Sequence, residues 1–169
     1  MSIIPIKLNL RFYGDPVLRG RCKPVAKVAE KDKAIFSEML ELMKLSGGVG
    51  LAGPQVGINK QMVLVDIGQG PIMLVNPRIM KRSGSDHMEE GCLSLPGVYV
   101  SVKRAKSIMV NAVNTDNQKI TLSASGLLAR VLQHEIDHLR GRMIIDYAGV
   151  IAKIKLKKKL KNFLAGSKV

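Results

Sequence analysis

The segment Gln133-His134-Glu135-Ile136-Asp137-His138 contains the pattern H-E-x-x-H, whose residue types and spacing suit metal chemistry. On a helix, side chains four residues apart lie above one another, so His134 and His138 can reach one ion. Glu135 can then reach a water molecule at that ion and take its proton. A solvated His/Glu pair is the alternative. It is disfavoured by the apolar residues around the pattern, which are Leu127, Leu128, Val131, Leu132 and Leu139.

Two histidines do not make a stable metal site, so a third ligand is required. The extension H-x-x-G-x-x-H of one zinc-protease class is broken, because Ile144 stands at its last histidine position. A glutamate from a downstream helix, as in another class, is disfavoured, since Asp146 is the only carboxylate after His138. Two upstream donors remain. Cys92 is favoured, because it lies in a tight turn that leads towards a strand, whereas His87 lies in a polar loop expected at the surface.

The elements that must position these residues are indicated by the spacing of apolar side chains. We expect an amphipathic helix from about Glu30 to Leu45. A second helix is expected from Ser123 or Ser125 to Arg140, with Gly141 just after its end. Five runs between the helices have strand character, at residues 62–66, 72–76, 98–102, 107–113 and 119–122. Because helices and strands do not alternate, this order predicts an α+β fold with mostly antiparallel strands.

The composition is that of one soluble globular domain, with 169 residues, of which 46% are hydrophobic and 24% charged. No apolar run approaches the ~18–20 residues of a membrane span, and residues 1–11 do not form a signal peptide. We therefore expect a cytoplasmic protein, or one of an organelle lumen if a presequence has been removed. The two cysteines, Cys22 and Cys92, do not make a disulfide scaffold, which leaves Cys92 available for a metal.

The net charge of +14 makes nucleic acid or another polyanion a candidate partner. Half of this charge lies in the tail, because residues 147–169 contain seven lysines and no acidic residue. We expect one domain at residues 1–148 and a Lys-rich helical extension at 149–169. One helical face of this extension would carry Leu156, Leu160, Phe163 and Leu164. A solvated surface helix, a helix that docks on RNA and a helix that binds an acidic membrane all fit this pattern.

Three segments resemble the three motifs of peptide deformylases, in the same order and at similar separations. They are Gly48-Val49-Gly50-Leu51-Ala52-Gly53-Pro54-Gln55, Glu90-Gly91-Cys92-Leu93-Ser94 and Gln133-His134-Glu135-Ile136-Asp137-His138. The opening Tyr13-Gly14-Asp15-Pro16-Val17-Leu18-Arg19 is also similar, so the resemblance covers about residues 9–148. It implies antiparallel β-sheets around a central helix that carries H-E-x-x-H. It also implies a hydrolase that removes the N-formyl group from the formyl-methionine of newly synthesised peptides and releases formate.

The family resemblance also implies a cofactor and roles for individual residues. One divalent metal ion would be held by Cys92 and the two histidines. It is iron(II) in many native enzymes, and zinc, nickel or cobalt can replace it. Glu135 would act as the base and later pass its proton to the leaving amine. The side-chain amide of Gln55 and the backbone N–H of Leu93 would donate hydrogen bonds to the tetrahedral oxyanion.

The glycine-rich loop from Gly48 to Gly57 is either a simple connector or an exposed backbone that pairs with an extended peptide. It lacks the Gly-Lys-Ser/Thr ending of a phosphate loop, which excludes nucleotide binding. The peptide would contact Val49 N–H and Gly50 C=O, with Gly91 on its other side. The methionine pocket would be lined by Met88, Leu127, Val131 and His134. All of these except the histidine could equally be core residues.

Two residues depart from the pattern that we expect of the family. Gly53 replaces the usual alanine and could loosen the placement of Gln55. Arg130 stands where an apolar residue is expected near the side-chain pocket, and its charge could reach solvent at the rim. Both departures leave the expected activity in place and bear on its rate and side-chain preference.

The expected partners are N-formyl-methionyl nascent peptides and, through the Lys-rich tail, ribosomal RNA; the chain itself is expected to be a monomer. Two other functions compete with this interpretation. An RNA-binding module with a structural metal would have no need of Glu135. A general metallopeptidase would need the downstream third ligand that this sequence lacks.

Overall fold

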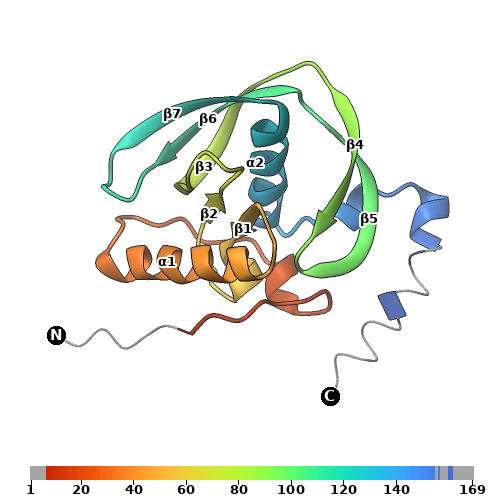
Figure 1. The fold of residues 1–169 in the computed structure, drawn as a ribbon, viewed down its shortest axis with the longest axis horizontal. Coiled ribbons are helices and arrows are strands. Elements are labelled where there is room, and N and C mark those ends of the chain that lie inside the picture. The colour runs from red at the N-terminus through yellow and green to blue at the C-terminus, as the bar shows by residue number, and fades with distance from the viewer. Residues whose placement is uncertain (1–6, 155, 157–159, 162–169) are drawn as a thin grey trace.

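The computed structural model describes residues 7–154, 156, 160 and 161 (Figure 1). Its helices and strands are α1 (Glu30–Leu45), β1 (Gly50–Ala52), β2 (Met62–Val65), β3 (Ile72–Ser83), β4 (Asp86–Cys92), β5 (Leu95–Arg104), β6 (Ser107–Val113), β7 (Lys119–Ser125) and α2 (Gly126–His138). Short 3-10 helices lie at Pro16–Arg19 (η1), Gly53–Val56 (η2) and Ile144–Tyr147 (η3). Every strand pair is antiparallel, which confirms the α+β class.

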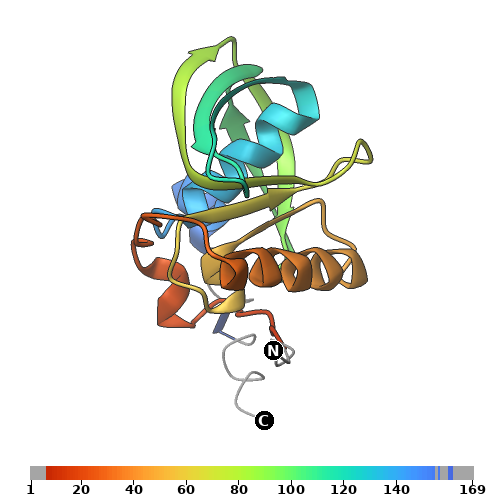
Figure 2. The ribbon, with the colours of Figure 1, turned by 90° about the vertical axis from the view of Figure 1, so that its left-hand side faces the viewer.

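The strands form two sheets that flank α2. One sheet has the order β1-β2-β3-β6-β7, and the other is the β4–β5 hairpin. In Figure 1, α2 stands between the large sheet and the hairpin, and Figure 2 shows α1 lying across the base. Both faces of β2 are covered, because Val63 and Val65 pack in the cluster of α2 whereas Met62 and Leu64 pack in that of α1. This explains the unbroken apolar sequence of β2.

Most of the expected elements are present, with two strands added. The bounds of α1 and β6 agree with the prediction. β3 is longer than expected and continues through a register shift after Val75, where Asn76 has a φ of +51°. β1 was not predicted, because it is short and lies inside the glycine-rich loop. β4 was not predicted either: His87 was expected in a polar loop and Cys92 in a tight turn, and five of the seven residues of this strand are charged, histidine or glycine.

The helix α2 begins after Ser125 and ends at His138, slightly before the predicted end at Arg140. The chain then turns at Gly141, which has a φ of +72°. A Cβ atom at this position would collide with the backbone carbonyl of Arg19. Glycine therefore allows the turn after α2 to pack directly on the end of η1.

The described part of the tail includes a helical turn at residues 150–154. Leu156 and Leu160 pack against the apolar cluster formed by β5, η1 and η3, whereas Ile151 and Ile154 are exposed. The predictions for Phe163, Leu164 and lysines 155, 157, 158 and 159 lie outside the described residues. Within the part of the chain that is described, no helix is long and apolar enough to cross a membrane.

Candidate metal centre

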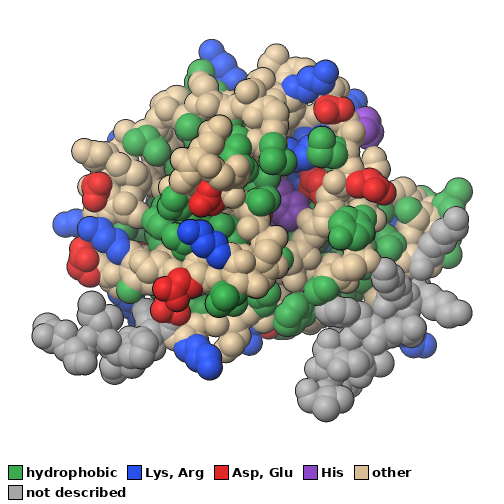
Figure 3. Space-filling model, viewed as in Figure 1, with side chains coloured by type: hydrophobic (Ala, Val, Ile, Leu, Met, Phe, Trp, Pro, Cys, Tyr) green, Lys and Arg blue, Asp and Glu red, His purple; other side chains and the backbone are tan. Residues whose placement is uncertain are grey.

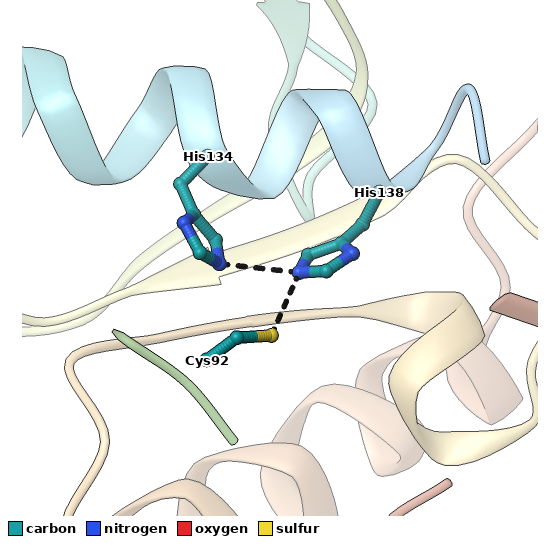
Figure 4. Close-up of side chains that lie close together, drawn as sticks. All are labelled: Cys92, His134 and His138. Carbon is teal, nitrogen blue, oxygen red and sulfur yellow. Dashed lines mark hydrogen bonds between the residues drawn. The ribbon is translucent and has the colours of Figure 1, made fainter. Parts of the chain in front are cut away.

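Three potential ligands converge below α2, although they come from two separate elements. Within the described residues, Cys92, His134 and His138 offer ligand atoms that all lie within 4.8 Å of one another. Cys92 Sγ lies 3.4 Å from His138 Nε2, which lies 3.2 Å from His134 Nε2 (Figure 4). This spacing suits a single ion between the three atoms. The alternative donor His87 is exposed on β4 and does not belong to the cluster.

Cys92 is held by the geometry of the β4–β5 hairpin. The strands pair as far as Cys92 and Leu95, with a two-residue turn between them and a register shift after Glu90. Cys92 is therefore the last residue of β4, where the bulge directs its side chain towards α2. Both cysteines are free thiols, and burial raises the pKa of Cys22 to about 11, so that Cys22 is an inert core residue.

Glu135 lies beside the three ligands with one oxygen unsatisfied. Its carboxylate is buried, and burial raises its pKa to about 7. Glu135 Oε2 and His138 Nδ1 are buried atoms without a hydrogen-bond partner in the described protein. Since a buried polar atom without a partner is costly, the carboxylate fits a site that receives a metal, water or substrate. Gly50 makes room for it, because a Cβ there would overlap Glu135 Oε1.

The electrostatic environment of the two histidines differs. Burial lowers the pKa of His134, but hydrogen bonds with Cys92 and Glu90 outweigh it and raise this pKa to about 10. Burial and the neighbouring positive charge of His134 place the pKa of His138 well below its usual value. In the metal-free protein, His134 therefore holds a proton that a binding metal must displace.

Glu90 is the centre of a buried ion-pair network that the sequence analysis did not assign. It accepts two hydrogen bonds of 2.9 Å from Arg104 and one of 2.7 Å from Arg130. Its Oε2 lies 2.9 Å from His134 Nδ1. Burial raises the pKa of Glu90, but the hydrogen bonds with His134 and Arg104 outweigh this and lower it to about 2. The carboxylate orients His134 so that its Nε2 faces the other ligands.

The role of Glu90 in orienting His134 could have been inferred from the sequence, because the second ring nitrogen of a metal-binding histidine usually donates a hydrogen bond to a carboxylate or carbonyl oxygen. Glu90, two residues before Cys92, was the natural candidate. Asp137, inside the H-E-x-x-H segment, extends the network by pairing with Arg104 and by accepting a 2.6 Å hydrogen bond from Tyr147. The histidine orientation and the hairpin are thus held by one set of charges.

The expectation for Arg130 was right about its place and wrong about its exposure, because the residue lines the cleft but its guanidinium is buried and does not reach solvent at the rim. The side chain is buried and turns towards the hairpin. It donates to Glu90, to the carbonyl of Val102 at 3.0 Å and to the carbonyl of Asp86 at 3.1 Å. A desolvated arginine with this many acceptors serves to connect elements.

Gln55 is fixed by both ends of its amide. Its Oε1 accepts a 2.8 Å hydrogen bond from Ala52 N–H, and its Nε2 donates to Ser94 Oγ at 3.3 Å and to Cys92 Sγ at 3.5 Å. The donor end therefore points towards the ligand cluster. Gly53 does not loosen this arrangement, because its Cα packs so tightly that a Cβ would lie 2.7 Å from the carbonyl oxygen of Lys60.

A cleft of about 570 Å³ opens over the cluster and contains Glu135, His134, Cys92 and Gln55 in its lining. Figure 3 shows histidine at the bottom of a hollow between apolar side chains. The predicted pocket residues all line it: Val131 is buried, whereas Met88 and Leu127 are about half exposed. Exposed apolar side chains beside a cleft are more consistent with binding than with a core role.

The backbone residues predicted to contact a peptide lie on the two sides of this cleft. Val49 and Gly50 belong to the β1 side, and Gly91 and Leu93 to the end of β4. Among the strands of the described residues, β1 is the outer strand of the large sheet and β4 pairs with β5 alone. Each side therefore offers a strand edge that an extended chain could join.

Comparison with known proteins agrees with this geometry. The sequence matches the family model described as polypeptide deformylase over residues 7–154. It is 48% identical over 140 residues to a peptide deformylase of Dictyoglomus thermophilum, covering 83% of this chain and 92% of that protein. The fold is similar to the crystal structure of peptide deformylase from Thermotoga maritima, with a TM-score of 0.83, 43% identity and coverage of 85% of this chain and 99% of the other. The crystal structure of a peptide deformylase from Legionella pneumophila is similar with a TM-score of 0.89 and 33% identity, and the match covers 96% of this chain and 98% of the other.

Proposed function

Since this chain belongs to the polypeptide deformylase family, a family of metalloenzymes, we propose that Cys92, His134 and His138 hold its metal ion and that Glu135 is its base. The protein is a hydrolase that removes the formyl group from formyl-methionyl peptides. One observation supports the assignment of residues: three ligand atoms converge beside a buried carboxylate oxygen that has no hydrogen-bond partner among the described residues.

The donor set fits a divalent transition metal. One thiolate and two imidazole nitrogens suit iron(II), zinc, nickel or cobalt, and we propose iron(II) for the native enzyme. When bound, the ion would act as a Lewis acid and lower the pKa of a water molecule. Because the thiolate can be oxidised, an iron form would lose activity in air.

The residues around the ion divide the proton transfers and charge stabilisation between them. Glu135 takes the proton of the attacking water and later delivers it to the amine that leaves. The amide of Gln55 and the N–H of Leu93 donate to the oxyanion that develops on the formyl oxygen when the formyl carbon is attacked. Ala52 and Ser94 support this role of Gln55, because they hold its amide with the donor end towards the ligands. Loss of one such donor typically raises the barrier by ~3–4 kcal/mol.

The peptide would lie extended between the edges of β1 and β4. Val49 N–H and Gly50 C=O would pair with its backbone on one side, and Gly91 on the other. The methionine side chain would enter the pocket formed by Met88, Leu127 and Val131. The apolar lining and the closeness of this pocket to His134 support that placement.

The remaining expectations concern the setting of the enzyme. We propose a catalytic unit at residues 1–148 and a docking extension at 149–169 that binds ribosomal RNA where nascent chains emerge. The seven lysines of residues 147–169 support this role. We further propose that the protein is a cytoplasmic monomer.

The direct test is release of formate from formyl-Met-Ala-Ser by protein reconstituted with metal. The wild type should release formate and leave internal peptide bonds intact. Glu135→Ala should bind the same amount of metal and lose roughly 10²–10⁴-fold in turnover. A metal-loaded Glu135→Ala enzyme of normal activity would refute the role of the base, and cleavage of internal bonds would point to a general peptidase.

A further inference from the structure

The hairpin that carries Cys92 and the helix that carries the histidines pack in different apolar clusters. Residues of β5 such as Val98, Val100 and Val102 belong to the cluster of η1 and η3. Residues of α2 such as Leu132 and Ile136 belong to the cluster of the large sheet. The hairpin and α2 therefore share no common apolar core among the described residues. Apolar packing is also non-directional, so it would not fix their orientation. Their relative position must depend strongly on polar contacts between them.

Arg130 makes such contacts to both strands of the hairpin at once. From α2, its Nη1 donates to Glu90 Oε1 of β4 at 2.7 Å and to Val102 O of β5 at 3.0 Å. Its Nη2 donates to Asp86 O of β4 at 3.1 Å. The side chain is 8% exposed, so these bonds face little competition from water. A planar guanidinium with three fixed acceptors defines both the distance and the orientation of the hairpin.

The contact with Glu90 links Arg130 to two of the ligands. Glu90 holds His134 Nδ1 at 2.9 Å and lies two residues before Cys92 in the same strand. A shift of Glu90 along the helix would therefore move the sulfur and turn the imidazole together. Metal–ligand bonds tolerate only small errors in such distances.

We propose that Arg130 is a positioning residue that assembles the metal site before the ion arrives, by locking the Cys92 hairpin onto the histidine helix. This inference rests on the proposed ligands Cys92, His134 and His138. Arg130 is not one of the three ligand residues, and although it belongs to the lining of the cleft, the proposed role acts through its bond to Glu90. Its loss should weaken metal binding roughly 10–100-fold, the range typical of residues that support the ligands from behind.

The experiment measures cobalt(II) binding by the metal-free full-length chain, followed by the thiolate-to-cobalt charge-transfer absorption. Arg130→Met should raise the dissociation constant at least tenfold and, at saturating cobalt, weaken the charge-transfer band because Cys92 no longer reaches the ion correctly. Arg130→Lys keeps a positive charge but lacks the planar guanidinium, so it should lose less cobalt affinity than Arg130→Met. Because the lysine variant keeps a charge opposite Glu90, it tests the proposal even if Arg130→Met does not fold.

Gln133→Met provides the matched control. Gln133 lies on the same helix and anchors it to both backbone groups of Ala105, at 3.1 Å and 2.9 Å, without a bond to Glu90. The Gln133→Met variant should lose thermal stability, while its cobalt dissociation constant should stay within about twofold of the wild-type value. Equal losses of affinity in Gln133→Met and Arg130→Lys would reduce Arg130 to a general stabilising role and overturn the proposal.

The outcomes separate this inference from the function on which it rests. If the wild type shows no thiolate-to-cobalt band, the proposed ligands themselves are wrong. If the wild type shows the band, and folded Arg130 variants bind cobalt as tightly with the same spectrum, only the positioning role is refuted.

Discussion

At the scale of single residues, the site gives two buried glutamates opposite properties. Burial raises the pKa of Glu135 to about 7, because it outweighs the lowering effect of the charges on His134 and Arg104. Glu90 is also buried, but its hydrogen bonds with His134 and Arg104 lower its pKa to about 2. A carboxylate near neutrality can exchange protons, whereas one that is always charged can hold a histidine in place.

The pKa of Glu135 predicts how activity depends on pH. The base must be deprotonated, so kcat/KM should fall as pH decreases through the pKa of Glu135. A bound cation lowers the metal-free value of about 7, which places the acid limb at or below pH 7. The measurement is kcat/KM for a formyl peptide against pH, with metal content determined at each point. A flat profile down to the ordinary glutamate value of 4.5, with metal retained, would contradict the role of Glu135.

The lowered pKa of Glu90 predicts a pH-dependent contribution to stability. Its folded-state pKa of about 2 lies below the ordinary 4.5, so the contribution is complete above pH 4.5 and is lost as pH falls towards 2. Glu90→Gln removes this charge and leaves two buried arginines partly unpaired, at a cost of roughly 3–5 kcal/mol at neutral pH.

Urea unfolding of the metal-free wild type and Glu90→Gln between pH 7 and pH 2.5 checks this expectation. The difference in unfolding free energy should shrink as the solution becomes more acidic, because the wild-type carboxylate then becomes neutral as well. A difference that stays constant over this range would show that the charge of Glu90 does not stabilise the fold.

The sequence allowed the three ligand candidates and the base to be predicted, because their chemistry imposes a short spacing and a small set of residue types. The arginine partners of Glu90 could not be predicted in the same way. Arg104 and Arg130 lie 14 and 40 residues away along the chain, and no periodicity signals an ion pair between distant segments. Their identification required the fold.

At the scale of elements, the β4–β5 hairpin and α2 are brought together by the helices and strands around them. The helix α1 and the strands β2 and β6 were predictable, since their apolar spacing matches a half-buried helix or a buried strand. β4 was not, because Asp86, His87 and Glu89 are exposed and give no alternation of apolar residues. Its pairing with β5, which does alternate, makes it a strand.

The loop that positions Gln55 depends on a glycine for steric reasons. In Gly53→Ala, the new Cβ would lie 2.7 Å and 2.8 Å from the carbonyl oxygens of Lys60 and Ile58. We expect a loss of roughly 1–3 kcal/mol in unfolding free energy, because backbone atoms must move to relieve the overlap. Gly20→Ala is the matched control, since its Cβ would meet only Val17 O at 3.6 Å. Chemical denaturation of both variants tests this, and equal stability would show that the loop relaxes freely.

At the scale of the whole molecule, charge and catalysis are separated along the chain. The net charge is +14, and the tail supplies seven of these charges, whereas the cleft contains the buried carboxylates Glu90 and Glu135. Leu156 and Leu160 connect the tail to the apolar cluster of β5 and η3. The charge of the tail and the residues of the metal centre therefore lie in separate segments of the sequence.

This separation predicts that ribosome binding and deformylation can be lost independently. A chain with Lys157, Lys158 and Lys159 changed to glutamine should bind ribosomes more weakly. The slope of the logarithm of its binding constant against the logarithm of salt concentration should decrease in magnitude by roughly two to three. Truncation after Ala148 should abolish this binding.

In the control variant, glutamine replaces three exposed lysines outside the tail, Lys27, Lys31 and Lys44. Co-sedimentation with ribosomes at several salt concentrations, beside an assay on a formyl tripeptide, separates the two properties. Equal losses in the tail variant and the control would mean that total charge, and not the tail, determines binding.

The most direct test of the account is a crystal structure of the zinc-loaded protein with anomalous scattering at the zinc edge. We expect one strong anomalous peak bonded to Cys92 Sγ at about 2.3 Å and to Nε2 of His134 and His138 at about 2.0–2.1 Å, next to the carboxylate of Glu135. A peak elsewhere, or one from which the sulfur of Cys92 is excluded, would contradict it.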